Sequence, residues 1–241
     1  MKIYKQDFSD LSIREHLLGQ MRKVFSEASP RETLKLVYEM FGEDAVMATG
    51  FGASGVVMMH MLSTILPDPK VFYLDTDLLF PETYALRDRL ADELGISFIR
   101  VHGGMSVSAQ QLRYGDDLWD KAPDTCCFIR KVAPLRHFLS SKVAWITGIR
   151  RDQALSRRSA QVVEWDQANG LLKFNPLVTW TEEDIWSYIR LNDIPYNELH
   201  DAGYPSIGCM PCTGVPEAGE SLRAGRWAGR DKMECGIHVQ P

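Results

Sequence analysis

Short apolar runs with strand character alternate with helical patterns along much of this 241-residue chain, and this alternation limits the possible folds most strongly. The runs at residues 45–49, 71–74, 96–101 and 143–147 are expected strands, and helices are expected at 30–41, 56–66, 81–94 and 181–191. Strands separated by helices predict an α/β fold, in which helices wrap a parallel sheet and ligands bind at the carboxyl ends of the strands. Residues 162–165 and 171–174, joined by a turn with Asn169 and Gly170, are expected to form a hairpin at the sheet edge.

Composition narrows the classes of protein that the chain can represent. With 45% apolar and 24% charged side chains, it can build one globular domain, or a domain with a C-terminal appendage. No apolar run approaches the length of a membrane span, and nothing at the N-terminus resembles a signal peptide, so we expect a soluble, cytoplasmic protein. The net charge of −5 argues against nonspecific nucleic-acid binding, which needs a basic face.

Five cysteines fall into three groups. Cys126 and Cys127 are adjacent, Cys209 and Cys212 form a Cys-x-x-Cys pair, and Cys235 stands alone. Two close pairs are what a four-cysteine metal or iron–sulfur site requires, because each pair pre-organises two thiolates and the fold has only to bring the pairs together. Two alternatives stay open for the pairs, namely buried apolar side chains and a disulfide framework.

The surroundings of the cysteines favour the metal or cluster site. Prolines and glycines flank Cys209 and Cys212, which indicates a tight turn rather than a core strand. A chain of this length can build its own core, so it has little need of disulfides. The remaining thiol, Cys235, lies three residues from His238 and near several basic residues, a setting that favours the thiolate and predicts a mobile nucleophile. These basic residues are Arg223, Arg226, Arg230 and Lys232.

Two segments are candidates for binding an anion. Gly50, Gly52 and Ser54 lie in a glycine-rich turn between an expected strand and an expected helix, where backbone amides could cradle an anion. The turn has neither the Walker A lysine nor the GxGxxG spacing, and such a turn is often a plain connection. Residues 148–153 follow the fourth expected strand, with Arg157 and Arg158 shortly after. Guanidinium groups there suit phosphate or sulfate oxygens, although arginine-rich loops are often only solvated surface.

The terminal segment Glu234-Cys235-Gly236-Ile237-His238 is the most specific motif of the chain, and the two cysteine pairs accompany it. With these motifs the chain resembles the assimilatory adenylyl-sulfate (APS) reductases of the phosphoadenylyl-sulfate reductase family, over about residues 40–239. The other segments that carry the resemblance are 49–57, 74–77, 81–84, 126–135, 148–153, 174–177, 207–213 and 223–227.

The resemblance implies a thioredoxin-dependent reduction of adenosine 5′-phosphosulfate to sulfite and AMP, in sulfate assimilation. It implies that a 4Fe–4S cluster is held by Cys126, Cys127, Cys209 and Cys212, and that Cys235 is the nucleophile. Lys131 would lie between cluster and substrate. The phosphosulfate would be surrounded by Arg158, Arg223, Arg226 and His238, and the nucleotide pocket would be lined by Gly50, Gly52, Ser54 and Gly148.

The same resemblance implies an adenine-nucleotide alpha-hydrolase (PP-loop) architecture, with a five-stranded parallel sheet in the order 3-2-1-4-5, and a homo-oligomer. Residues 1–205 would form the nucleotide-binding reductase domain with the first cysteine pair. Residues 206–241 would carry the second pair and a mobile catalytic tail. The chain departs from the common family pattern at Ser54, where an acidic residue often follows the alanine, and at Asp77, which is often glycine.

The implied chemistry makes demands on charge. A thiolate that attacks a phosphosulfate brings two anions together, so cations such as Lys131 and the arginines must neutralise the sulfate and the departing phosphate. The product would be a Cys235 S-sulfonate, and no second cysteine lies near Cys235 in sequence, so an external dithiol must release the sulfite.

Three alternatives to this function stay open. The substrate could be 3′-phosphoadenosine 5′-phosphosulfate, although cluster cysteines accompany a preference for the form without the 3′-phosphate in this family. The chain could instead be a non-redox PP-loop ATP pyrophosphatase or adenylyltransferase, which would leave Cys235 without a task. A zinc-stabilised binding module is the third alternative.

Overall fold

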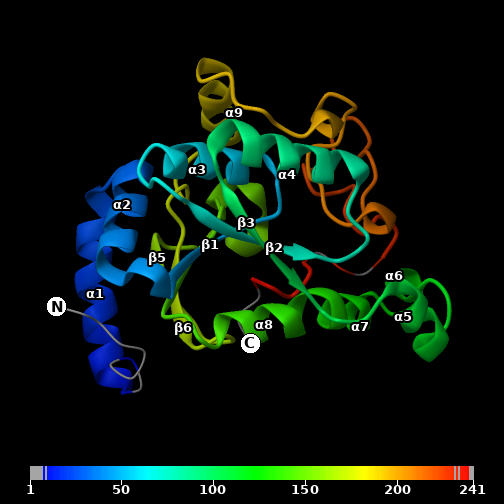
Figure 1. The fold of residues 1–241 in the computed structure, drawn as a ribbon, viewed down its shortest axis with the longest axis horizontal. Coiled ribbons are helices and arrows are strands. Elements are labelled where there is room, and N and C mark those ends of the chain that lie inside the picture. The colour runs from blue at the N-terminus through cyan, green and yellow to red at the C-terminus, as the bar shows by residue number, and fades with distance from the viewer. Residues whose placement is uncertain (1–7, 9, 231, 233, 239–241) are drawn as a thin grey trace.

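The computed structural model describes residues 8, 10–230, 232 and 234–238, and its centre is one six-stranded sheet (Figure 1). The strands are β1 (Ala45–Thr49), β2 (Lys70–Asp75), β3 (Ser97–His102), β4 (Ala144–Ile146), β5 (Val163–Asp166) and β6 (Leu171–Phe174), in the spatial order β3-β2-β1-β4-β6-β5. All neighbours are parallel except β5 and β6, which are antiparallel.

This topology confirms the expected α/β fold and the hairpin at the sheet edge. The five parallel strands follow the order implied by the family resemblance when β6 is taken as the fifth strand. The sheet nevertheless has six strands and not five, because β5 pairs with β6 and extends the sheet by one antiparallel edge strand.

The longer helices are α1 (Leu11–Glu27), α2 (Pro30–Phe41), α3 (Ala53–Ser63), α4 (Pro81–Leu94), α5 (Val107–Tyr114) and α9 (Glu182–Leu191). Shorter turns of helix are α6 (Leu118–Lys121), α7 (Pro123–Cys127), η3 (Phe128–Val132) and α8 (Ala133–Leu139), of which η3 is π-helical. Single 3₁₀ turns occur at η2 (Gly42–Asp44), η4 (Arg151–Gln153), η5 (Leu155–Arg157), η6 (Glu198–His200) and η7 (Met210–Cys212).

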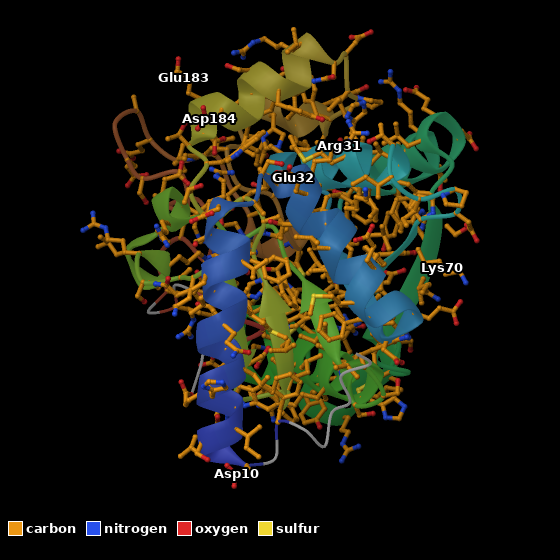
Figure 2. All side chains as sticks on the ribbon, turned by 90° about the vertical axis from the view of Figure 1, so that its left-hand side faces the viewer. Asp10, Arg31, Glu32, Lys70, Glu183 and Asp184 are labelled. Atoms are coloured by element: carbon orange, nitrogen blue, oxygen red, sulfur yellow. The ribbon has the colours of Figure 1, made fainter. Side chains whose placement is uncertain are left out.

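Local sequence accounts for where several helices begin. The Ser29 hydroxyl accepts from the Glu32 amide, and the Glu32 carboxylate accepts from the Ser29 amide, which is the expected capping box of α2. Asp10 caps α1, a helix that the strand and helix patterns did not predict. Figure 2 shows Asp10 and Glu32 at the starts of these two helices. Among the described residues, no helix combines the length and apolar character needed to cross a membrane.

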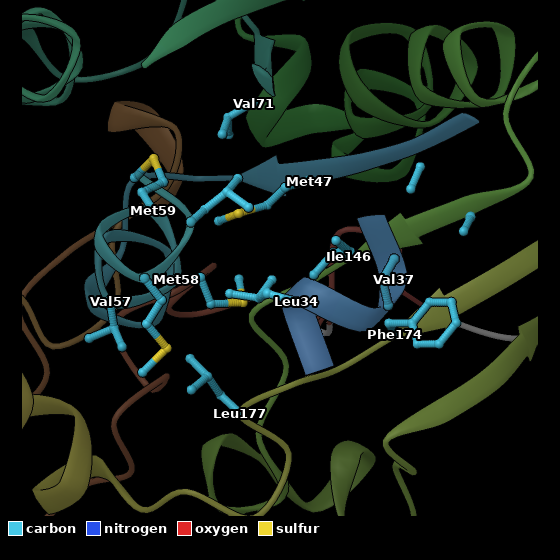
Figure 3. Packing of buried hydrophobic residues seen from close by; sticks show 14 of the residues in the cluster. Leu34, Val37, Met47, Val57, Met58, Met59, Val71, Ile146, Phe174 and Leu177 are labelled. Carbon is cyan, nitrogen blue, oxygen red and sulfur yellow. The ribbon is translucent and has the colours of Figure 1, made fainter. Parts of the chain in front are cut away.

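Two apolar layers sandwich the sheet. On one face, buried side chains of α2 and α3 pack against β1, β4 and β6, as the close view of Leu34, Met58, Met47 and Phe174 shows (Figure 3). On the other face, Leu135 of α8 packs with Val46, Phe72 and Trp145. Alternate residues of each strand therefore face opposite layers, as in other sheets that helices cover on both sides.

The described end of the chain folds back onto the α8 face of the sheet. Ile237 packs against the cluster formed by Leu135 and Trp145, and the His238 ring stacks on Trp145 with centroids 5.5 Å apart. Figure 1 shows this segment in red, between the sheet and α8. The second cysteine pair is also tied to the body, because Leu79 and Cys209 form an antiparallel bridge. The division of the chain at residue 205 stays a prediction.

Candidate active site

A pocket of about 280 Å³ lies at the carboxyl ends of β1 and β4, the edge that the alternating pattern predicted for ligands. Five segments supply most of its lining: the glycine-rich turn after β1, the loop after β4, residues 205–208, residues 222–227 and the tail at 234–238. Residues of β2, η3, α8, α9 and other elements complete it. The pocket therefore combines segments that are nearly 200 residues apart in sequence.

The glycine-rich turn opens α3 toward this pocket. Gly50, Gly52 and Ser54 all line it, and Gly52 is the N-cap of α3. The Phe51 amide donates to the Thr49 hydroxyl at 2.9 Å while Phe51 adopts a positive φ of 57°. Gly55 lies so close to the same hydroxyl that an added Cβ would be 2.7 Å from it. The turn thus presents the positive end of a helix dipole to the pocket.

The loop after β4 lies against this turn. Gly148 lines the pocket, and a Cβ at this position would lie 3.2 Å from the Ser54 Cβ, so the close approach favours glycine. Arg150 is buried, donates to the Ser54 hydroxyl and forms ion pairs with Asp152 and Glu182. Arg150 therefore links the loop to the turn and to α9, with its charge already compensated by carboxylates.

The structure brings Lys131, Arg223 and Arg226 to the pocket, as the resemblance implied, together with His238 and Cys235. Arg158 is exposed and is not among the described residues that line the pocket, whereas its neighbour Arg157 lines it. Arg157 ends the 3₁₀ turn η5, and Arg158 follows as its C-cap.

Lys131 and Arg226 have the least compensated charges in the pocket. Within the described part of the chain, no carboxylate lies within ion-pair distance of either side chain, and both are about 9% exposed. Arg226 donates to the Ile207 carbonyl and lies 4.6 Å over the Trp227 ring. These two cations suit an anion that enters the pocket.

The pKa of Lys131 reflects its sulfur neighbours. Burial alone would lower this pKa, but the neighbouring Cys209 and Cys235 sulfurs outweigh burial and raise it. The ammonium group is therefore favoured over the neutral amine. A permanent cation beside Cys235 is what an anionic reaction partner at that sulfur requires.

The four paired cysteines line one small cavity beside the pocket. Cys126 and Cys127 come from α7, and Cys209 and Cys212 come from the turn that includes η7. All four are buried free thiols, which excludes the disulfide framework for them, and Trp119 and Trp227 complete the apolar wall. Four thiols that converge from two segments on one apolar cavity fit a soft metal centre or an iron–sulfur cluster.

Burial raises the pKa of the Cys126, Cys127 and Cys212 thiols, to about 12 for Cys127. At Cys209, burial is outweighed by the charge of Lys131 and by a 3.3 Å contact with the Thr76 hydroxyl, so its pKa is lowered. In the described residues, no three His, Cys, Asp or Glu side chains converge closely enough to hold one metal ion. In a four-iron cluster each thiolate binds a different iron, so the ligands stand farther apart than around one ion.

Lys131 joins the two sites, because it lines both the pocket and the cysteine cavity. Lys131 lies on the π-helical turn η3, which directly follows the helix that carries Cys126 and Cys127. The position between the cysteine site and the pocket is the one that the resemblance implied for this lysine.

Sequence reasoning missed the partners of the tail. Arg157 and Arg223 both bind the carboxylate of Glu234, the residue before Cys235. The motif that contains Glu234 was visible in the sequence, but nothing in the spacing linked it to Arg157. Sequence reasoning also missed Lys173, which is buried and whose ammonium nitrogen lies 5.8 Å from the centre of the Trp145 ring. The residues around it in the strand gave no indication that a lysine would be buried there.

Asp77, the departure from the family pattern, has a structural explanation. Its φ is 54°, a conformation that glycine adopts without strain. Its carboxylate accepts from Arg100, His102 and Arg130, and these contacts hold the loop after β2. Asp77 therefore adopts a backbone conformation that favours glycine, and its side-chain contacts stabilise that conformation.

Comparisons with known proteins agree with this architecture. Residues 44–215 match the model of the phosphoadenosine phosphosulfate reductase domain. The chain is 48% identical to an adenosine 5′-phosphosulfate reductase of Salinibacter ruber, over 93% of this chain and 89% of that protein. It is 42% identical to a phosphoadenosine 5′-phosphosulfate reductase of Gloeobacter violaceus, over 97% of this chain and 98% of that protein.

Solved structures show the same relationship. The phosphoadenylyl-sulfate reductase of Candida auris, in a phosphate complex, superposes with a TM-score of 0.72 at 31% identity, covering 82% of this chain and 96% of the other. The FMN adenylyltransferase of Candida glabrata shares the fold alone, with a TM-score of 0.56 at 13% identity over 94% of this chain and 85% of the other. On the strength of the domain match and the identities to these reductases, the chain is an enzyme of the phosphoadenosine phosphosulfate reductase family.

Proposed function

We propose that the protein reduces adenosine 5′-phosphosulfate to sulfite and AMP, with thioredoxin as the electron donor and a Cys235 S-sulfonate as the intermediate. The observation that supports this most is the meeting of Cys235 with Lys131, Arg226 and the glycine-rich turn in one pocket. A thiol beside two uncompensated cations and a helix N-terminus has what it needs to react with an anionic nucleotide.

The chemistry proceeds in two transfers. The Cys235 thiolate attacks the sulfate sulfur, a sulfur–sulfur bond forms, and the bond from sulfur to the bridging oxygen breaks, so AMP leaves with that electron pair. A thiolate of reduced thioredoxin then attacks the Cys235 sulfur and releases sulfite. The second thioredoxin thiol resolves the mixed disulfide, so the dithiol supplies both electrons.

Two groups of residues divide the work on the substrate. The amides of the turn at Gly50, Gly52 and Ser54 would bind phosphate oxygens at the start of α3. Lys131 and Arg226 would stabilise the charge that develops between the sulfate and the departing phosphate. Because Lys131 and Arg226 are themselves buried, these interactions are stronger than they would be between fully solvated groups.

We also propose that Cys126, Cys127, Cys209 and Cys212 hold a 4Fe–4S cluster, since their thiols share one apolar cavity. When bound, the cluster would cross-link the two cysteine pairs and add an anionic group beside Lys131. The chain's own residues prepare this site: Thr76 contacts Cys209, and the Arg230 guanidinium lies 3.8 Å from the Cys212 sulfur. Such partners orient metal ligands and tune them.

The substrate is tested by measuring sulfite release with reduced thioredoxin, from adenosine 5′-phosphosulfate and from its 3′-phosphorylated form in parallel. We expect the form without the 3′-phosphate to be preferred. A clear preference for the 3′-phosphorylated nucleotide would reverse the substrate assignment, and no sulfite from either would refute the function. The cytoplasmic location and the homo-oligomeric state remain predictions from the sequence.

Lys131→Ala is expected to lower kcat/KM for sulfite formation by about tenfold to a thousandfold, the range for a lost cationic group at a developing charge. The exposed Lys35 of α2 offers a matched control, since Lys35→Ala removes one positive charge far from the pocket. The S-sulfonate adduct, measured as protein mass after mixing with nucleotide without thioredoxin, should form slowly in the first variant only. Equal adduct rates in both variants would remove Lys131 from the substrate site.

Gly208→Ala is expected to weaken mainly nucleotide binding, whereas Gly225→Ala is expected to lower mainly the free energy of unfolding. A Cβ at Gly208 would lie 2.2 Å from the Arg226 guanidinium, which can shift, so we expect weaker nucleotide binding with little change in unfolding. A Cβ at Gly225 would lie 2.0 Å from the Gly214 carbonyl oxygen, where backbone must move, so we expect a loss of about 1–3 kcal/mol in the free energy of unfolding. Calorimetric titration with AMP and urea unfolding of both variants test this. The reverse pattern would contradict it.

A further inference from the structure

The tail carries its own anion into the pocket. Glu234 is 11% exposed, and its carboxylate accepts two hydrogen bonds from Arg157, at 3.0 Å each, and one from Arg223 at 3.1 Å. Ser156 donates a fourth, longer one at 3.3 Å. A carboxylate held in a two-pronged arrangement by one guanidinium and by a second from another segment imitates the way arginines bind phosphate or sulfate.

The charges around Glu234 in the pocket keep its carboxyl group ionised. Arg157 and Arg223 both line the pocket and share the single carboxylate of Glu234, while Lys131 and Arg226 line the same pocket. Burial alone would raise the pKa of the Glu234 carboxyl, but the hydrogen bonds and charges of Arg157 and Arg223 outweigh burial and lower it. The carboxylate is therefore ionised and competes with any other anion for these two arginines.

We propose that Glu234 is a latch: it occupies the anion site of Arg157 and Arg223 in the ligand-free enzyme, holds the neighbouring Cys235 docked, and is displaced by the phosphate oxygens of a bound nucleotide. The inference rests on the proposed function for the identity of that nucleotide. Displacement removes one restraint on the segment that bears the thiol. Its other described anchors include the packing of Cys235 against the cluster that contains Trp227, the packing of Ile237, and the stacking of His238 on Trp145.

The latch would also favour release of the tail after Cys235 has been sulfonated. Once Cys235 carries a sulfonate, a second anion lies one residue from Glu234, and both compete for the same two guanidinium groups. The sulfonated tail is then held less firmly than the thiol form. It becomes accessible to an external dithiol at the stage of the reaction when one is needed.

The test measures how fast N-ethylmaleimide labels Cys235 in the cluster-containing enzyme, with the label located by mass spectrometry of the C-terminal peptide. In the unaltered enzyme, saturating AMP should accelerate labelling by about tenfold or more, since the loss of even one of the charge-assisted hydrogen bonds to Glu234 would have an effect of this size. Glu234→Gln should be labelled rapidly without AMP and should bind AMP more tightly, because both arginines are released from the carboxylate. Glu234→Asp keeps the charge and should restore slow labelling in part.

Glu183→Gln is the matched control, because Glu183 is an exposed carboxylate on α9, shown at the surface in Figure 2. It should label like the unaltered enzyme. Slower labelling of the unaltered enzyme in AMP, or an unchanged rate in Glu234→Gln, would overturn the latch. The labelling needs no turnover, so a failed sulfite assay with an intact AMP response would refute the proposed reaction and leave the latch standing.

Discussion

Cys235→Ser is expected to reduce sulfite release by at least about four orders of magnitude, the scale seen when an enzyme loses its nucleophile. The serine hydroxyl cannot take over, because it is far less acidic than a thiol and is a much weaker nucleophile at neutral pH. Iron content and AMP affinity should stay near those of the unaltered enzyme, since Cys235 packs against the cysteine cluster but does not line the cavity that the four paired cysteines share.

The effect of Cys235→Ser is tested by three measurements: sulfite release, protein mass after exposure to the nucleotide, and iron per chain. The mass should show no added sulfonate, whereas the unaltered enzyme should gain one. Retained adduct formation in Cys235→Ser would assign the nucleophile to another residue. Loss of most of the iron would show that Cys235 is a ligand and that the division of the cysteines into four and one is wrong.

Cys209→Ser is expected to remove most of the cluster and to lower activity by more than about a hundredfold. Changes to the hydrogen-bond partners of metal ligands already cost about 10–100-fold, and a serine oxygen is a poor ligand for iron. The turn at 209–212 would also lose its link to α7, so the segment that includes Trp227 should become more sensitive to protease. Iron and acid-labile sulfide per chain, with the visible spectrum, measure the effect.

Met210→Leu is the control for that experiment, because Met210 lies between the two cysteines of the turn and its side chain is about half exposed. It should keep both iron and activity. An unchanged visible spectrum in Cys209→Ser would contradict the ligand assignment. Zinc in place of iron in the unaltered enzyme would show that the four cysteines form a zinc site.

Much of the sheet was predictable, because β1, β2, β4 and β6 are short, mostly buried runs with helix or turn signals beside them. The capping box placed α2 to the residue, and the Asn169–Gly170 turn predicted the hairpin of β5 and β6. Helix α1 was missed, since its apolar side chains do not form one clear stripe: Leu18, Met21 and Phe25 are buried, whereas Ile13 and Val24 are exposed.

The sequence predicted which types of residue form the candidate site, but only in part which individual residues line it. Cysteine spacing and the terminal motif singled out the sulfurs, and these patterns are local in sequence. Arg157 and Arg158 are adjacent and chemically alike, and only the folded structure shows that Arg157 lines the pocket while Arg158 is exposed. Arg150 likewise reads as an anion ligand, but Asp152 and Glu182 compensate its charge.

By itself, the sequence determined the α/β alternation, the turn at the start of α3, the two cysteine pairs and the solitary thiol, because each depends on neighbours a few residues away. Tertiary structure alone decided that the two pairs share a cavity, that Lys131 lies between that cavity and the pocket, and that Glu234 binds Arg157 across 77 residues of sequence. These contacts depend on the order in which parallel strands assemble and on the path of the tail over the α8 face. Local periodicity carries no record of contacts over such separations, since they follow from packing the whole chain around one sheet.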